Sequence, residues 1–259
     1  MIDSLYIGAT GMHAQQMGID VISNNLANVN TNGFKKSRVD FEDLLYRDTI
    51  RANGLVGNPD NVHRLGMGAA VAGTGKVFTA GDIKKTDDPL DLAIQGQGFF
   101  EVVLPTGELG YTRSGAFEIN RDGMLSTADG YQLSGSLQVP VDATGIVVEA
   151  NGRVSANVAG ESRPVEIGHL EIANFPNPGG LTPLGDNLYL PTQKSGDPIR
   201  GIPGEIGLGF VAQGFLEASN VKLVEEMISL ILAQRAYEIN SKVVQASDEI
   251  MSITNSLYR

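Results

Sequence analysis

The sequence predicts an α+β protein: N- and C-terminal α-helices packed as a coiled-coil-like inner domain, an extended linker and a central all-β domain. Three observations predict this arrangement. All 11 prolines lie between Pro59 and Pro203, so both ends of the chain lack the strongest helix breaker. Apolar residues recur at helical spacing in both ends. The middle instead shows short apolar runs separated by turn residues, which is typical of β structure.

The N-terminal arm carries a weak helical pattern. Leu5, Met12, Ile19 and Leu26 are spaced seven residues apart, and Ile22 lies on the adjoining row. Glycines interrupt the pattern, and each costs about 1 kcal/mol relative to alanine in a helix. Burying each large apolar side chain contributes roughly 1.5–3 kcal/mol, so docking outweighs that cost. We therefore expect this arm to be frayed in isolation and to become ordered on assembly.

The segment 39–85 has the composition of an extended linker. Turn-forming pairs such as Asn53-Gly54 and Asn58-Pro59 recur in it, and a glycine-rich stretch runs from Gly66 to Gly75. A flexible loop is the simplest interpretation. A loop of this length in a compact protein is unusual, however, and such loops are often functional.

The middle of the chain, 86–214, is predicted to be β structure. Phe99-Phe100-Glu101-Val102-Val103-Leu104 is a strand candidate. The turn residues Asn120–Gly123 follow another apolar run and signal a hairpin, and Asn151-Gly152 separates two more runs. Short strands at this spacing predict a small barrel or sandwich.

The C-terminal arm is predicted to be one long helix, because no proline and no glycine occurs after Gly214. Two interleaved apolar series with a seven-residue repeat form a coiled-coil seam: Leu232, Ile239, Ala246 and Ile253 in one, and Val243, Ile250 and Leu257 in the other. A third series lies one position beyond and begins at Leu223. The apolar stripe is thus wider than a two-stranded seam requires, which indicates more than one helical neighbour.

The start of this helix is expected at Ser219-Asn220, because both residues are good N-caps. From Val221 to Leu257 a continuous helix would be roughly 55 Å long at about 1.5 Å per residue. One alternative stays open: the two arms are the halves of a helix pair inside a monomer. The width of the stripe favours assembly with other copies.

These assignments divide the chain into a terminal-helix domain of 1–38 plus 215–259, a linker of 39–85 and a central β domain of 86–214. A net charge of −11 argues against a nucleic-acid-binding surface, and no apolar run is long enough to predict a membrane span. The absence of cysteine excludes disulfides, thiol catalysis and cysteine-based zinc sites. An ordinary secretion signal is not visible at the N-terminus.

No pattern predicts a catalytic, cofactor-binding or metal site. The 3 histidines lie in separate segments, and Gly73-Thr74-Gly75-Lys76 lacks the glycine spacing and the following Ser or Thr of a phosphate loop. Asp87, Asp88 and Asp91 form an acidic cluster that is best explained as turn residues. Two alternatives stay open: a glycan hydrolase using a pair of these carboxylates, and an adhesin, against which the absence of tryptophan counts.

Several segments resemble flagellar rod and hook proteins. Ser23–Lys35 resembles the N-terminal signature of this family, Pro89–Phe100 the entry to its β domain, and Leu216–Val221 with Ala233–Lys242 its C-terminal signature. The matches follow the family's order through the whole chain. The matching positions are Asn24, Asn25, Asn28, Asn30, Thr31, Gly33, Phe34, Gly96, Gly98, Phe99, Phe100, Ser219, Asn220, Gln234, Arg235, Ala236 and Tyr237.

The resemblance implies a structural subunit of the flagellar basal body with no enzymatic activity and no cofactor. Length and the opening residues Met1–Tyr6 are most similar to the distal rod subunit; the alternative is a proximal rod subunit or a hook-type axial protein. Such subunits polymerise helically into a hollow drive shaft that transmits torque from motor to hook and serves as an export channel. The implied location is the rod spanning the periplasm, reached by type III export without a cleavable signal.

The implied partners are further copies of the chain, proximal rod proteins, the hook protein, the surrounding ring (bushing) proteins and the type III export apparatus, with no nucleic acid and no membrane insertion. The apolar stripes would pack against the helices of adjacent subunits. The expected interface residues are Leu5, Met12, Ile19, Ile22, Leu26, Leu232, Ile239, Val243, Ile250, Ile253 and Leu257. The linker would stiffen the polymer, so removing residues 47–65 is expected to make it more bendable.

Overall fold

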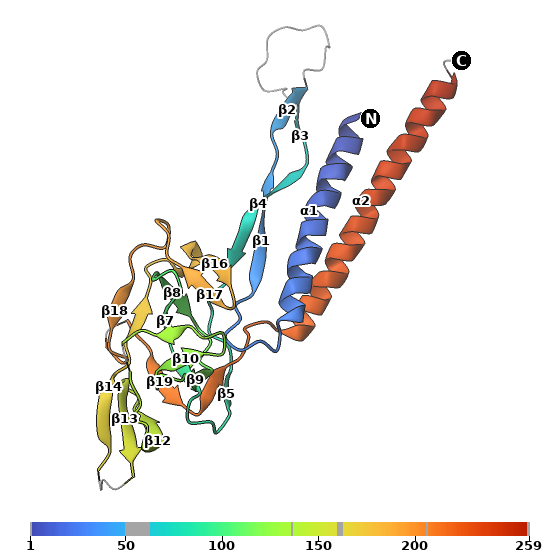
Figure 1. Ribbon diagram of the computed structural model, residues 1–259. Coiled ribbons are helices and arrows are strands. Elements are labelled where there is room, and N and C mark those ends of the chain that lie inside the picture. The colour runs from blue at the N-terminus through green and yellow to red at the C-terminus, as the bar shows by residue number, and fades with distance from the viewer. Residues whose placement is uncertain (1, 50–62, 136, 160–162, 206, 258–259) are drawn as a thin grey trace. The chain divides into compact units, whose positions relative to one another are not determined.

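The computed structural model confirms the α+β class and divides the chain into two compact units (Figure 1). It describes residues 2–49, 63–135, 137–159, 163–205 and 207–257. The helical unit comprises Met1–Ala27, Ser37–Lys76 and Lys222–Arg259, and the β unit comprises Asn28–Lys36 and Val77–Val221. The predicted boundaries were different: most of the predicted linker belongs with the helices, and 28–36 and 215–221 belong with the β structure.

Two long helices dominate the helical unit. Helix α1 spans Ile2–Ala27 and α2 spans Leu223–Leu257, without interruption in either. They are antiparallel, because the start of α1 lies beside the later part of α2 (Figure 1). A Cβ atom on Gly8 would lie 2.7 Å from Val244 Cγ2, and one on Gly11 would lie 2.9 Å from Asn240 Nδ2. The glycines of α1 therefore allow a close approach of the two helices.

The segment predicted as an extended linker forms a β-ribbon in its described parts. Strand β1 (Ser37–Asp43) pairs antiparallel with β4 (Ala69–Lys76), and β2 (Tyr46–Thr49) pairs antiparallel with β3 (His63–Gly66). Both β1 and β4 contact α1. Of the segment 47–65, whose removal was expected to make a polymer more bendable, residues 50–62 lie outside the described part of the chain.

The largest sheet of the β unit has nine strands in the described residues. They are β7 (Phe99–Val103), β8 (Leu109–Thr112), β9 (Phe117–Ile119), β10 (Leu125–Thr127), β11 (Gln132–Leu133), β15 (Ile172–Asn174), β16 (Thr182–Gly185), β17 (Leu188–Leu190) and β18 (Ile199–Gly201). The order along the sheet is β16-β17-β8-β7-β11-β10-β9, and β15 joins β7 to β18. The hairpin predicted at Asn120–Gly123 is confirmed as the β9–β10 turn.

Smaller sheets complete the β unit. Strands β12 (Ala143–Val148), β13 (Arg153–Val158) and β14 (Val165–His169) form a three-stranded sheet that contains the predicted Asn151-Gly152 turn. Two pairs join distant parts of the chain: β5 (Ile83–Lys85) with β20 (Phe215–Glu217), and β6 (Leu92–Gln95) with β19 (Phe210–Gln213). A short 3-10 helix, η2, covers Pro178–Gly180.

The core of the β unit forms on both faces of β7. Successive residues of a strand point to opposite faces, and Phe99 and Phe100 accordingly lie in different apolar clusters. Phe100 packs edge-on against Phe117, with ring centroids 5.2 Å apart. Phe99 belongs to an aromatic cluster in which Tyr111 and Phe175 meet at 90° with centroids 4.8 Å apart. Such edge-to-face pairs add to the stabilisation from burial alone.

Candidate assembly surface and buried ion cluster

Helix α2 presents different residue types to α1 and to its surroundings. Glu226, Ala233, Asn240 and Ser247 recur every seven residues; Glu226 and Asn240 meet α1, and the other two are buried. The seam with α1 is thus made largely of small and polar side chains. Val244, which lies against Gly8, is an aliphatic member of this seam, and the exposed large aliphatic side chains of α2 lie on another face.

An exposed apolar stripe runs along α2. We define it by the six expected interface residues Leu232, Ile239, Val243, Ile250, Ile253 and Leu257. Their exposed fractions range from 42% at Val243 to 80% at Leu257. A helix of a monomer normally buries its aliphatic face. The wide apolar face inferred from periodicity is divided between two environments. One side of α2 packs on α1 of the same chain, and the stripe has no cover within the described residues.

The exposed apolar surface continues toward the start of α2. The additional residues are Leu223, Val224, Met227, Ile228 and Ile231, and each exposes close to half of its surface or more. Leu223 begins the third predicted apolar series, whereas Val224, Met227, Ile228 and Ile231 belong to none of the predicted series, although the sequence around Ile228 and Ile231 is as apolar as the rest. Exposed apolar patches of this extent on soluble proteins mark interaction sites.

The expected interface residues of α1 have a different environment. They are half-buried within the chain: Leu5, Met12, Ile19, Ile22 and Leu26. Helix α1 is covered by α2 on one side and contacts the ribbon of β1 and β4 as well. The structure therefore brings the α1 and α2 sets into one unit but leaves only the α2 set largely uncovered.

A buried ion cluster lies in the β unit where the N- and C-terminal signatures meet. Lys35 Nζ lies 2.6 Å from Glu217 Oε1, and Arg113 Nη1 lies 3.2 Å from Glu217 Oε2. All three side chains are almost completely buried. The sequence did not predict this cluster, because its members are far apart along the chain and no spacing links them.

Hydrogen bonds to backbone atoms complete the ion cluster. Lys35 Nζ donates to Thr79 O at 2.7 Å, and Gly81 N donates to Glu217 Oε1 at 2.8 Å. Burial lowers the pKa of Lys35, and the negative charge of Glu217 opposes that shift. Burial likewise lowers the pKa of Arg113. Glu217 therefore joins three segments of the chain through one carboxylate, whose charge offsets part of the cost of removing two cations from water.

Gly33 is required at its position in the N-terminal signature. Its φ is +71°, and a Cβ atom there would lie 2.5 Å from Ser114 N. Gly33 N donates to Glu217 O at 2.7 Å, so the backbone of the signature lies directly against the ion cluster. Only glycine combines this conformation with this approach. Phe34, next to it, is buried.

Asn220 does not cap α2, contrary to the prediction. The helix begins at Leu223. The Asn220 side chain instead accepts a hydrogen bond from Lys36 N at 2.7 Å and donates one to Val77 O at 2.8 Å. Ser219 Oγ accepts from Val221 N at 3.2 Å. An asparagine amide can accept a hydrogen bond from one backbone segment and donate one to another. Asn220 makes these two bonds instead of capping the helix.

Asn25 plays a comparable role in the helical unit. Its amide nitrogen donates to Ser37 O at 2.8 Å and to Glu226 Oε2 at 3.2 Å, and its oxygen accepts from Ser37 N at 2.8 Å. One buried side chain thus ties the end of α1 to β1 and to the start of α2. Asn25 and Asn220 therefore serve as structural connectors.

The other signature residues are distributed over both units. Gly96 O accepts from Arg113 Nη2 at 2.6 Å, and Gly98, Phe99 and Phe100 lead into the core strand β7. Thr31 Oγ1 donates to Asn28 Oδ1 at 3.2 Å. The positions without a shared site are Asn24 and Asn30, which are exposed, and Gln234, Arg235, Ala236 and Tyr237, which lie on α2 outside its buried seam.

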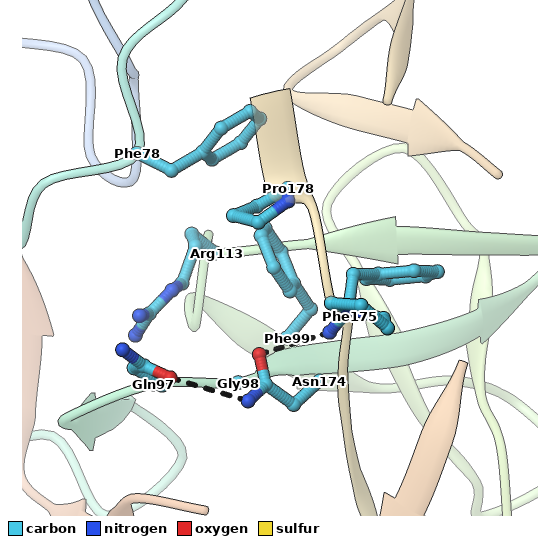
Figure 2. Close-up of a pocket in the computed structure, with 9 residues that line it drawn as sticks. Phe78, Gln97, Gly98, Phe99, Arg113, Asn174, Phe175 and Pro178 are labelled. Atoms are coloured by element: carbon cyan, nitrogen blue, oxygen red, sulfur yellow. Dashed lines mark hydrogen bonds between the residues drawn. The ribbon is translucent and has the colours of Figure 1, made fainter. Parts of the chain in front are cut away.

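A small pocket of about 140 Å³ lies beside Arg113 (Figure 2). The polar atoms of Asn174 are held by internal bonds: Asn174 Nδ2 donates to Gln97 Oε1 at 3.3 Å, and Asn174 Oδ1 accepts from Phe175 N at 2.9 Å. The Arg113 guanidinium lies 5.5 Å from the centre of the Phe99 ring. The arrangement offers packing and a cation–π contact but no acid–base pair.

The acidic cluster has the geometry expected of turn residues. Asp87 has a φ of +62° and an ion pair with Lys85 at 2.7 Å, and Asp88 Oδ1 accepts from Leu90 N at 3.0 Å. Within the described residues, no group of three or more His, Asp or Glu side chains is placed to hold a metal ion. Neither described helix is long and apolar enough to cross a membrane.

Three sequence profiles of one group of proteins match different parts of the chain. The profile described as flagella basal body rod protein matches residues 5–35. The flagellar hook protein FlgE/F/G D1 domain matches residues 93–156, and the flagellar basal body rod FlgEFG protein C-terminal profile matches residues 212–257. The matched ranges contain most of α1, the core strand β7 and all of α2.

Full-length relatives agree with these profiles. The chain is 44% identical over 261 residues to the flagellar basal-body rod protein FlgG of Buchnera aphidicola subsp. Schizaphis graminum, covering 99% of this chain and 100% of the relative. It is 42% identical over 265 residues to FlgG of Borreliella burgdorferi, with all of both chains covered. The flagellar hook protein FlgE of Helicobacter pylori is 43% identical over 141 residues, which is 52% of this chain and 19% of the hook protein.

Proposed function

This chain belongs to the FlgG family of flagellar basal-body rod proteins and is a structural subunit of the rod, and we propose that the exposed stripe of α2 joins adjacent subunits in it. The observation that carries the proposal is the exposure of six large aliphatic side chains on one helix of the folded chain. Burying each would contribute roughly 1.5–3 kcal/mol. Repeated in every subunit, such contacts favour a polymer.

The proposed polymer is the distal rod, a hollow shaft that transmits torque from motor to hook and serves as an export channel. Full-length similarity to relatives named FlgG supports this assignment over a proximal rod subunit. Similarity to the hook protein covers only about half of the chain, which makes the hook-type alternative weaker. The fold supports a structural role, because the signature residues Asn25, Gly33 and Asn220 bind or lie against backbone, and of the signature positions only Gly98 and Phe99 line the small pocket beside Arg113.

The basal-body location of the family leads to finer proposals about neighbours and transport. We expect the rod to span the periplasm and the subunits to arrive by type III export without a cleavable signal. The expected neighbours are proximal rod proteins below, the hook protein above and the ring proteins around the shaft. We also propose that Asp87 and Asp88 serve the turn before β6 and have no catalytic role.

Electron microscopy of basal bodies tests the assignment to the distal rod. A strain that lacks this chain is expected to have rods that stop short and carry no hook, and reintroduction of the chain should restore both. Loss of the whole rod would instead favour a proximal subunit. A full-length rod with no hook would favour the hook-type alternative, and intact flagella would refute a role in the axial structure.

A further inference from the structure

The helical unit contains a groove of about 600 Å³ between α1 and β4. Tyr6, His13 and Met17 of α1 form one wall, and Ala69, Ala70 and Gly73 of β4 form the other. Because these strand residues are small, a hollow remains between the strand and the helix. No residue of α2 lines it among the described residues, although α2 belongs to the same unit.

Neither a close contact nor a positive φ explains the glycine at position 73, in contrast to other glycines of this unit. Gly8 faces Val244, and Gly68 has a φ of +108° and lies against Thr10. Gly73 is in the middle of a strand, has no positive φ, and a Cβ atom on it would meet nothing within 4 Å. Glycine weakens a strand, and within one it often marks a β-bulge or a close approach of a ligand or another backbone. The register of β1 and β4 shifts beside Gly73, and the hollow next to it leaves room for such an approach.

Apolar side chains border this ribbon and are themselves exposed. Tyr6, Phe41 and Tyr46 expose about half of their surface, and Leu45 exposes 86%. Of these residues Tyr6 lines the hollow, whose other apolar lining residues are Met17, Leu44, Ala69, Ala70 and Val71. The stripe of α2 is a convex row of large aliphatic side chains that the same chain leaves uncovered. The two surfaces complement each other in shape and polarity, but they do not fill each other within one chain.

We propose that the groove between α1 and β4 receives the α2 stripe of a second copy, with Gly73 at the closest approach. The inference rests on the proposed function, because it names the surface that covers the stripe in the polymer. The contact joins two different patches of identical chains. Such heterologous contacts repeat without closing into a symmetric dimer, and they generate helical filaments when the rotation does not close a ring. The contact therefore gives the polymer two different ends, one with an unfilled groove and one with an uncovered stripe.

Site-directed cross-linking tests the contact, because the chain has no cysteine of its own. Copies carrying Gly73→Cys are mixed with copies carrying a cysteine at one stripe position, such as Ile239→Cys or Ile250→Cys. The mixture is polymerised and treated with a short bismaleimide. We expect covalent pairs between different copies for one or more stripe positions. Gln245→Cys, on the polar side of α2, is the matched control and should give at least tenfold less product.

Two results would overturn the inference. One is polymer that cross-links at no stripe position, or as readily at Gln245→Cys. The other is efficient cross-linking of Gly73→Cys copies with each other, which indicates a symmetric contact. Unsubstituted chain is polymerised in parallel. If it fails to polymerise, the proposed function itself fails and the inference falls with it, whereas normal polymer without the expected cross-link refutes the groove alone.

A second variant keeps the test independent of cysteine chemistry. Gly73→Leu fills the groove without a clash inside the chain, so the monomer should fold as before while the concentration needed for polymerisation rises at least tenfold. Ala72→Leu changes the neighbouring exposed residue, which does not line the groove, and should polymerise normally. Equal polymerisation of both variants would contradict the proposal.

Discussion

Glu217 is the residue on which the buried charges of the β unit depend. It contacts Lys35 and Arg113 and also accepts a hydrogen bond from Gly81 N. Removing the negative charge leaves two cations buried without it, and breaking a buried pair in this way costs about 3–5 kcal/mol. We expect Glu217→Gln to lower the free energy of unfolding by that amount in urea unfolding followed by tyrosine fluorescence.

The matched control for Glu217 is another acid in an ion pair. Glu225 Oε1 lies 3.1 Å from Lys222 Nζ, but both side chains are mostly exposed. Exposed pairs contribute about 0–1 kcal/mol, so Glu225→Gln should change stability little. Equal losses for the two variants would show that burial of the cluster is not what makes Glu217 important.

Tyr189 makes stability depend on alkaline pH. Burial, reinforced by the charge of Glu217, raises its pKa from 10.0 to about 12. The unfolded chain therefore releases the phenol proton at lower pH than the folded chain. The contribution is complete below pH 10 and is lost as the pH rises to about 12. At about 1.4 kcal/mol per pKa unit, it amounts to roughly 2–3 kcal/mol.

Substitution of Tyr189 isolates this contribution. Between pH 9.5 and 11.5, urea unfolding followed by circular dichroism should show stability falling less steeply in Tyr189→Phe than in the unsubstituted chain. Tyr111, whose pKa burial also raises to about 12, keeps its own share of the slope. Identical pH slopes for the two proteins would contradict the shift assigned to Tyr189.

The residue types at the signature were visible in the sequence, but their partners were not. Gly33 was singled out by its motif, and its φ and close contact explain why a glycine is needed. Asn220 was assigned to capping from local preference alone. Its actual partners, Lys36 N and Val77 O, lie more than 140 positions away. Local rules cannot identify such partners, because the hydrogen bond depends on the tertiary fold.

At the scale of elements, the glycines of α1 distinguish packing from helix propensity. A Cβ on Gly8 would lie 2.7 Å from Val244 Cγ2, whereas one on Gly18 would lie at an ordinary 3.7 Å from Phe41 Cζ. Gly18→Ala should therefore stabilise α1 by about 1 kcal/mol through helix propensity. In Gly8→Ala the same gain is offset by the clash, because the β-branched Val244 cannot easily rotate away.

Hydrogen exchange of α1 amides measures the difference between these variants. We expect slower exchange in Gly18→Ala than in the unsubstituted chain, and unchanged or faster exchange in Gly8→Ala. Equal protection in both variants would mean that the helices do not approach closely at Gly8. The expectation that α1 is frayed in isolation remains a prediction, which exchange in a chain truncated before α2 would test.

Elements with strong local patterns were predictable, and those defined by distant pairing were not. The predicted helix Val221–Leu257 begins two residues before the observed α2 and ends at the same residue. Turn residues located the β9–β10 and β12–β13 hairpins. The ribbon of β1 and β4 was predicted as a linker, because its strands are polar or small and its pairing joins Ser37 to Lys76. A strand whose stability comes from its partner carries little signal of its own.

At the scale of the whole molecule, each unit is assembled from separated parts of the chain. The predicted domains followed sequence continuity, apart from the joining of the two terminal arms. They could not show that 28–36 leaves the helices or that 37–76 joins them, because those placements depend on contacts such as Lys35 with Glu217 and Phe41 beside Gly18. The stripe of α2 was predictable, because the apolar residues of α2 recur over a wider face than one neighbouring helix can cover.

A single charge placed in the α2 stripe tests whether the stripe joins subunits. Ile250 is about half exposed in the stripe, so Ile250→Asp should leave the chain folded. Burying an unpaired carboxylate between subunits is strongly unfavourable, and the variant should not polymerise. Gln245→Asp places the same charge on the polar side of α2 and serves as the control.

The most direct measurement is sedimentation of the purified variants under conditions in which the unsubstituted chain polymerises, with circular dichroism to confirm an intact β unit. We expect polymer in the pellet for Gln245→Asp and only soluble, folded chain for Ile250→Asp. Normal polymerisation of Ile250→Asp would contradict this expectation.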